Sequence, residues 1–296
     1  MKNIMRFFLE KFFTAFAWLA TFTAMSAIFI LIGFLALRGY STINLELFFG
    51  QANWLKAITG AQPVFGGLWP AMAGTIALVL LSCSIAIPVG VAAGIYLSEY
   101  ASPKIQSAAG FAVDLMAGIP SIVMGLFGFS IIILLKNTFL PQARTCLMLA
   151  AVCIALLVMP YLIRTTQNSL QSISEERRLL GISLGFSTWQ NIRHILLPSS
   201  SKGILSGIIL SIGRAAEDTA VILLTGVVSQ AFVPRSLWDK FEAIPFRIYY
   251  LAAEHRSSAE LEQAYGAALV LLIITGLLFI LAFLFQKSIE KKWIIR

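Results

Sequence analysis

Six long apolar runs divide this 296-residue chain and constrain its fold more than any other feature. A helix needs about 20 predominantly apolar residues to cross the hydrocarbon layer of a membrane, and each run approaches or exceeds that length. Apolar runs of this kind, joined by short polar segments, predict an all-α integral membrane protein. The expected spans are residues 12–37, 69–97, 106–135, 146–163, 203–233 and 264–286.

The composition agrees with a membrane protein and excludes several other classes. Hydrophobic residues make up 58% of the chain and charged residues 12%, with a mean hydropathy of +0.85. A soluble domain has about a quarter of its residues charged. The net charge of +8 does not indicate nucleic acid as a partner, because the Lys and Arg residues lie between the apolar runs without interleaved aromatics. Without a linker or low-complexity segment, residues 1–296 are expected to form a single transmembrane domain.

The polar segments also predict an orientation. If the N-terminus is cytoplasmic, thirteen Lys and Arg residues fall on the cytoplasmic side and eight on the other. Short cytoplasmic loops carry the excess of positive charge, so we expect both termini in the cytoplasm. The first run, Phe12 to Leu37, is too long for the apolar core of a signal peptide and is expected to be a retained span.

Residue spacings that other functions require are absent. Cys83, Cys146 and Cys153 fall inside apolar runs without C-x-x-C spacing, so we expect small core residues and neither disulfides nor metal ligands. The sequence has no G-x-x-x-x-G-K-[ST] motif, and His194 and His255 are isolated. We therefore expect no catalytic residue and no cofactor, and energy from ATP would have to come from another subunit.

Residues 164–202 form the longest expected cytoplasmic segment and predict two short helices. Ser172 or Ser174 can cap the first helix, and Gly185 can end it in the left-handed conformation. The second, "STWQNIRHILLP", opens with a capping box and is expected to stop at Pro198. Its box is Ser187 with Gln190, and its apolar face is Trp189, Ile192 and Ile195 or Leu196. Periodicity leaves two interpretations open: an amphipathic helix on the membrane surface, or a docking element for a groove on a soluble partner.

Three charges lie within the fifth span. Arg214, Glu217 and Asp218 are three and four residues apart, which on one helix places them on the same face near the middle of the membrane. Such charges face a bundle interior or a water-filled path, so they are either a structural ion-pair cluster or part of a translocation path. A guanidinium offers paired donors to a tetrahedral oxyanion. The net charge of one Arg and two ionised carboxylates is minus one, which repels an anion. An anion path here therefore needs another cation, or one carboxyl group that is protonated or paired elsewhere.

The segment "LGISLGFSTWQNIRHILLP", residues 180–198, resembles the cytoplasmic loop of ABC importer permeases, whose pattern is E-A-A, three residues, Gly, nine residues and I-x-L-P. Leu179, Leu180 and Gly181 stand where the family has Glu-Ala-Ala. The resemblance implies a helix pair that seats in an ATPase subunit, with Glu175, Glu176, Arg177 and Arg178 as substitutes for the missing Glu. The docking residues it implies are Leu180, Gly185, Trp189, Ile195, Leu197, Pro198, Glu175 and Glu176.

Three further stretches resemble the A-type permease of the bacterial phosphate-specific ABC importer. They are "GTIALVLLSCSIAIPVGVAAGIYLSEYA" (74–101), "DLMAGIPSIVMGLFGF" (114–129) and "FEAIPFRIYYLA" (241–252). The resemblance implies a six-span type I importer permease in the bacterial inner membrane. Its implied partners are a C-type permease subunit, two cytoplasmic ATPase subunits and a periplasmic phosphate-binding protein.

The family pattern R-A-x-G-E-T falls on residues 214–219, with Glu217 in place of Gly and Asp218 in place of Glu. It implies that Arg214 neutralises the passing anion and that Asp218 orients Arg214. Asp114 is a further candidate partner of Arg214. Two alternatives remain: a permease for another oxyanion, or an ion-coupled secondary transporter that uses Glu217 and Asp218 as a proton relay.

Overall fold

The computed structural model describes residues 2–227 and 230–294, and the regular elements within these ranges are all helical. Six of the described helices are long and apolar enough to cross a membrane, in agreement with the expected all-α membrane fold. The helices are α1 (Lys2–Gly39), η1 (Tyr40–Thr42), α2 (Leu45–Phe49), α3 (Trp54–Ile58), α4 (Trp69–Glu99), α5 (Pro103–Ala117), α6 (Ser121–Thr138), α7 (Leu147–Gln171), α8 (Glu175–Ser183), α9 (Thr188–Asn191), η2 (Ile192–Leu196), α10 (Leu197–Glu217), α11 (Ala220–Thr225), α12 (Ile244–Ala253) and α13 (Ser258–Ile294).

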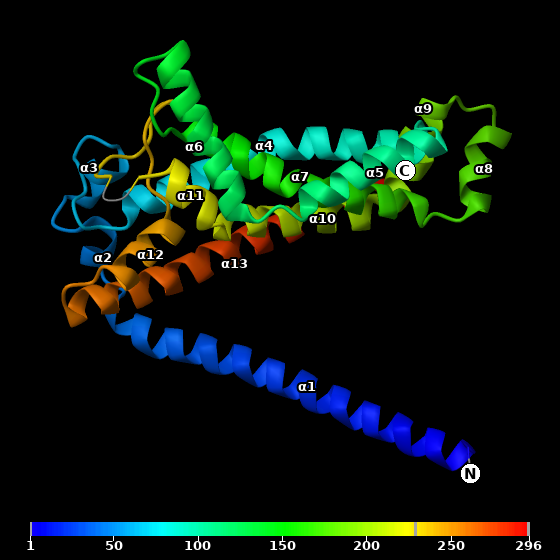
Figure 1. Cartoon of the computed structure of the whole chain (residues 1–296), viewed down its shortest axis with the longest axis horizontal. Helices are drawn as coiled ribbons and strands as arrows, with labels where there is room; N and C mark the ends of the chain where they lie inside the picture. Colours follow the sequence, from blue (N-terminus) through cyan, green and yellow to red (C-terminus); the bar gives the residue numbers. More distant parts are fainter. Residues whose placement is uncertain (1, 228–229, 295–296) are drawn as a thin grey trace.

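Helix α7 lies at the centre of the bundle and packs against α4, α5, α6 and α10 (Figure 1). The close approach of α4 to α7 depends on Gly90 and Gly94, because a Cβ atom at either position would lie 2.6 Å from the Cβ of Leu162 or Thr166. The main core around this contact contains the buried Cys83 and Cys153. All three cysteines are buried, as expected of small core residues.

Two expected spans are broken in the structure. The expectation of one helix over residues 106–135 is wrong: α5 ends at Ala117, and α6 begins at Ser121. Pro120 explains this break, since its ring disfavours helical backbone in the preceding residue and it has no N–H to donate. The span at 203–233 is also wrong as a single helix, because the chain leaves the helix at Asp218 and resumes it at Ala220. Residues 228 and 229 of that span lie outside the described residues.

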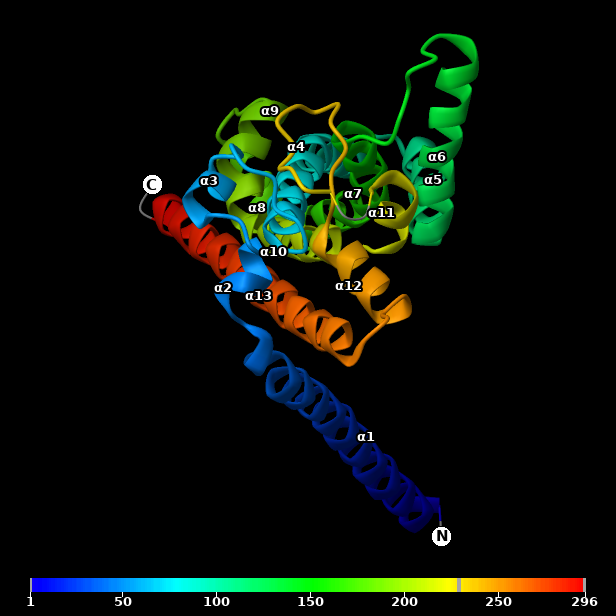
Figure 2. The ribbon, with the colours of Figure 1, turned by 90° about the vertical axis from the view of Figure 1, so that its left-hand side faces the viewer.

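Helix α1 diverges from the bundle and contacts it at one end (Figures 1 and 2). Gly39 lies against the backbone of Tyr265 in α13, and the rings of Phe34 and Tyr265 meet edge to face. None of the apolar window of this span is buried within the chain. The start of α1 and the end of α13 lie toward the same end of the molecule as α8 and α9 (Figure 1).

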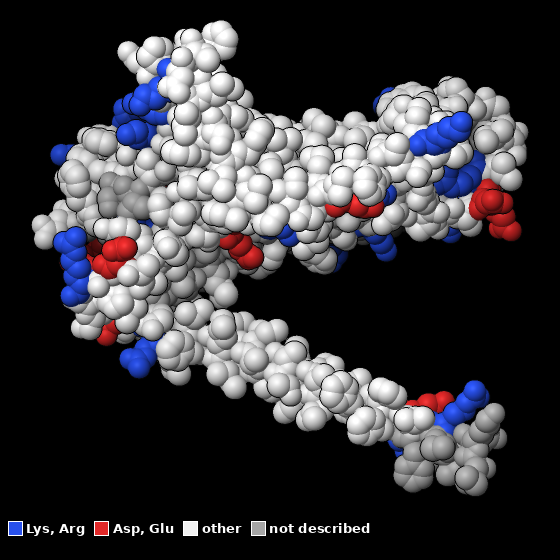
Figure 3. All heavy atoms as spheres, viewed as in Figure 1, with Lys and Arg blue, Asp and Glu red and all other residues white. Residues whose placement is uncertain are grey.

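We call the end that carries α8, α9 and η2 the docking end, and the end that carries α2, α3 and α12 the loop end. Lys and Arg side chains gather at both ends, and few charges interrupt the surface between them (Figure 3). At the loop end, the buried carboxylate of Glu242 accepts hydrogen bonds from Arg247 Nη1 (3.3 Å) and from the backbone N–H of Gln230 (3.0 Å). Arg247 also donates to the carbonyl of Gly66 (3.2 Å). This cluster joins segments that are far apart in the sequence.

The docking end contains the expected helix pair with different boundaries. Residues 164–202 are not a connection throughout, because α7 continues to Gln171 and α10 begins at Leu197. Gly185 has a φ of 78° after α8, and the capping box of Ser187 and Gln190 is present. The expected stop at Pro198 is wrong: the π-helical turn of η2 runs directly into α10. Pro198 follows this π-helical turn directly, so the irregular backbone of the turn lies where a proline, which has no N–H, enters a continuous helical segment.

Candidate translocation site and docking segment

Arg214 lies in the last turn of α10 and contacts α7 through Tyr161. Its Nη1 atom donates a 2.8 Å hydrogen bond to the Tyr161 hydroxyl oxygen, and its guanidinium carbon lies 4.6 Å from the centre of the Tyr161 ring. The two contacts fix the guanidinium between the helices while its side chain remains exposed on the chain. A cation held in this way retains donors for an anion.

The two neighbouring carboxylates, Glu217 and Asp218, lie where α10 ends. Asp218 is the C-cap of α10, with a φ of −69° and a ψ of 112°, so the chain leaves the helix directly after this residue. The Asp218 carboxylate accepts a 2.8 Å hydrogen bond from the backbone N–H of Val221 and thereby caps α11. Within residues 2–227 and 230–294, no ion pair joins Arg214 to Asp218. Glu217 is exposed one turn from Arg214.

Asp114 pairs with Arg164 of α7 and is not a partner of Arg214. The two Asp114 oxygens accept from Arg164 Nε at 2.8 Å and from Nη2 at 2.5 Å. Arg164 also donates to the carbonyl of Gly110 (2.7 Å) and to the side chain of Gln167 (3.0 Å). This bidentate pair therefore joins α7 to α5, the helix that precedes the break in the expected third span.

The docking segment, residues 175–198, exposes part of the residue set that the motif implies. Leu180 and Trp189 are each 55% exposed, and Leu179, Ile182 and Leu184 are exposed beside them. Glu175 and Glu176 are exposed in the first turn of α8, and Gly185 is exposed at the turn. Ile195, Leu197 and Pro198 are half-buried, and the first two pack on a core cluster of Leu170, Ile192 and Leu196. Ile195 and Leu197 therefore support the segment from within.

Sequence reasoning did not identify Tyr161, Arg164 and Glu99 as residues that pair with charged side chains elsewhere in the chain. Tyr161 follows Pro160 within the expected fourth span, where polar atoms need partners, and that position was the available signal. Arg164 directly follows that span. Their partners Arg214 and Asp114 lie fifty or more residues away, so only the packing of α7 identifies them.

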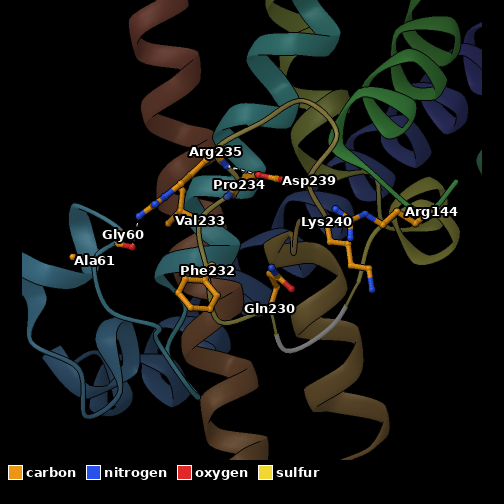
Figure 4. A pocket seen from close by; sticks show the side chains of 10 residues that line it. All are labelled: Gly60, Ala61, Arg144, Gln230, Phe232, Val233, Pro234, Arg235, Asp239 and Lys240. Carbon is orange, nitrogen blue, oxygen red and sulfur yellow. Dashed lines mark hydrogen bonds between the residues drawn. The ribbon is translucent and has the colours of Figure 1, made fainter. Parts of the chain in front are cut away.

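A cavity of about 500 Å³ opens at the loop end (Figure 4). Its charged lining residues are Arg144, Arg235, Lys240 and Asp239. Arg235 donates to the carbonyl of Gly60, and the Asp239 carboxylate accepts from the backbone N–H groups of residues 235 and 236 (3.0 and 2.8 Å). Arg144 and Lys240 have no ion pair among the described residues. The cavity is therefore positively charged.

The comparisons with known proteins agree with this architecture. The sequence profile of the family described as "Binding-protein-dependent transport system inner membrane component" matches residues 86–295. The chain is 31% identical over 254 residues to the phosphate transport system permease protein PstA of Pasteurella multocida, covering 85% of each chain. It is 31% identical over 225 residues to PstA 1 of Mycobacterium tuberculosis, covering 75% of this chain and 72% of the relative.

Solved structures support the fold. A bacterial alginate ABC transporter, crystallised in complex with an alginate pentasaccharide-bound periplasmic protein, aligns with a TM-score of 0.61 at 18% identity, over 93% of this chain and 96% of that chain. The MetNI methionine ABC transporter aligns with a TM-score of 0.58 at 14% identity, over 80% and 99%. The type I ABC importer permease fold and the sequence match together show that this chain belongs to the family of binding-protein-dependent transport system inner membrane components and groups with its PstA permeases.

Proposed function

We propose that this chain is one of two permease subunits of an ATP-driven importer that moves inorganic phosphate across the bacterial cytoplasmic membrane. The observation that carries the proposal is the 31% identity over 85% of both chains to a phosphate transport system permease. The remaining subunits are a C-type permease, a pair of cytoplasmic ATPases and a periplasmic phosphate-binding protein.

The docking segment supports the assignment of an ATPase partner. Exposed apolar residues on α8 and α9 are surrounded by charged residues, as expected of a helix that enters a hydrophobic groove. With the docking end in the cytoplasm, the Lys2 end of α1 and the Ile294 end of α13 also face the cytoplasm, as the distribution of positive charge predicts.

The charged groups support an anion as the substrate. At the loop end, the cavity with Arg144 and Lys240 raises the local concentration of anions near the entrance. Within the membrane, Arg214 offers the passing anion a charged donor set that Tyr161 holds in place. A single exposed guanidinium binds weakly, which suits transport because the anion must also leave. Glu217 lies on this path, and Asp218 shapes it by ending α10.

Reconstitution tests the proposed function. The complex, purified through this chain and reconstituted in vesicles with the binding protein, is expected to copurify with an ATPase and to take up radiolabelled phosphate only with ATP. Uptake of another oxyanion in place of phosphate would contradict the assignment of phosphate as the substrate. Uptake by this chain alone, driven by an ion gradient, would contradict the importer class and favour a secondary transporter.

A further inference from the structure

The docking segment is tied to the membrane bundle by one cluster of polar contacts around Arg178. Arg178 Nη1 donates to both carboxylate oxygens of Glu99, at 3.1 and 3.0 Å. Its Nη2 atom donates to the carbonyl of Leu170, and its Nε atom to the carbonyl of Ile173 (3.4 Å). Glu99 is the last residue of α4, and Leu170 lies near the end of α7. One side chain of α8 therefore reaches the ends of both central helices.

The surroundings of this ion pair restrict its motion. The Glu99 side chain is 9% exposed, and that of Arg178 is 26% exposed. The Ser98 hydroxyl donates a 2.6 Å hydrogen bond to Glu99 and so orients the carboxylate. Breaking a partly buried pair of this kind leaves a charge without a partner, so the two groups are strongly held together.

A second contact ties α9 to the same point. Asn191 Nδ2 donates a 3.0 Å hydrogen bond to the backbone carbonyl of Arg178. Gly181 leaves room for this side chain, because a Cβ atom there would lie 2.2 Å from Asn191 Oδ1. Both short helices are therefore joined to one another and, through Glu99, to α4.

Arg178 thus faces away from the surface that an ATPase would contact. It was expected as a substitute for the Glu of the docking motif, but its guanidinium is engaged within the chain. Glu175, Glu176 and Leu180 remain exposed on the same helix. Helix α8 therefore offers one face to a partner and anchors the other to the end of α4.

We infer that Arg178 is a positioning residue that, through its ion pair with Glu99, transmits movement of the docking segment to α4 during the transport cycle. The inference rests on the proposed function, since it assumes that an ATPase moves this segment. Helix α4 is packed against α7 through Gly90 and Gly94, so a displacement at Glu99 reaches the centre of the bundle.

The test compares the reconstituted complex with variants Arg178→Gln, Glu99→Gln and both together. The measured quantities are copurification of the ATPase, the melting temperature of the complex and the number of phosphate ions imported per ATP hydrolysed. Lys104→Gln is the control, because Lys104 is an exposed cation at the docking end with no ion pair among the described residues.

Each single variant is expected to keep the ATPase bound and to lower the ratio of phosphate to ATP about tenfold, and the double variant to lower it no further. Lys104→Gln is expected to stay within about twofold of wild type. Arg178→Lys, which keeps one contact to Glu99, is expected to give an intermediate ratio, and it replaces Arg178→Gln if that variant does not assemble.

Two results would overturn the inference. One is that Arg178→Gln or Arg178→Lys keeps the ATPase bound and imports as many phosphate ions per ATP hydrolysed as the wild-type complex. The other is additive loss in the double variant, which would show that the two residues act separately. If the wild-type complex itself binds no ATPase or moves no phosphate, the proposed function fails, and that result is distinct from either of these.

Discussion

Arg214 of α10 and Tyr161 of α7 form a charged hydrogen bond of 2.8 Å, and the guanidinium carbon also lies 4.6 Å from the centre of the tyrosine ring. The pair lies beside the point where α10 ends. A guanidinium that is restrained before the anion arrives loses less conformational entropy when it binds, so the pairing favours a defined contact during passage.

Two replacements of Tyr161 distinguish the contribution of its hydrogen bond to phosphate uptake from the contribution of its ring contact. Tyr161→Phe removes the hydroxyl, and a hydrogen bond to a charged group contributes about 1.5 kcal/mol, so we expect uptake to fall about tenfold. Tyr161→Leu also removes the ring face and is expected to be slower still. Initial rates of phosphate uptake measure both, and equal rates in Tyr161→Phe and wild type would show that the hydroxyl has no role.

Asp218 is predicted to act through its cap and not through a contact with Arg214. Asp218→Asn keeps an oxygen for the Val221 N–H and is expected to retain both stability and uptake. Asp218→Ala removes the cap and is expected to destabilise the fold by about 1 kcal/mol. Thermal unfolding in detergent and uptake assays distinguish the roles. If Asp218→Asn stops uptake at wild-type stability, the carboxylate charge itself is required.

The contact between α4 and α7 is predicted to tolerate no side chain at Gly94. A Cβ atom there would lie 2.6 Å from the Thr166 Cβ and 2.8 Å from the Ile163 carbonyl oxygen. We expect Gly94→Ala to destabilise the chain by about 1 to 3 kcal/mol. Gly276→Ala in α13 is the matched control, because a Cβ atom at Gly276 meets nothing within 4 Å. Equal melting temperatures for the two variants would contradict the packing.

The cations of the cavity at the loop end are predicted to assist capture. The double variant Arg144→Gln with Lys240→Gln is expected to raise the phosphate-loaded binding protein concentration needed for half-maximal uptake about threefold, and the effect is expected to shrink at high salt. Lys56→Gln, at the same end but outside the cavity lining, is the control. No change in the double variant at low salt would contradict this role.

The sequence predicts the elements of this fold better than their interruptions. The presence of six long apolar helices follows from hydrophobic length, and the Ser187 capping box and Gly185 follow from local chemistry that needs no tertiary contact. The break at Asp218 does not follow from hydropathy, which averages over a long window, although Asp itself favours caps over helix interiors.

Partners of the charged residues were the least predictable part. Arg214 contacts Tyr161 at a separation of 53 residues, a partner that the sequence pattern did not indicate. Arg178 was expected on the docking surface, and it pairs with Glu99 instead. Helical spacing identifies which groups can meet within one helix, whereas the packing of α7 and α4 against their neighbours decides which groups do meet.

The most direct test of the central claim is phosphate uptake by the reconstituted complex carrying Arg214→Gln. Lys202→Gln, an exposed cation nearer the start of the same helix, is the control. We predict that Arg214→Gln lowers ATP-dependent uptake at least about tenfold while the complex assembles and still hydrolyses ATP, and that Lys202→Gln transports normally. Wild-type uptake by Arg214→Gln would contradict the account and leave Arg214 and Tyr161 as a structural contact between α10 and α7.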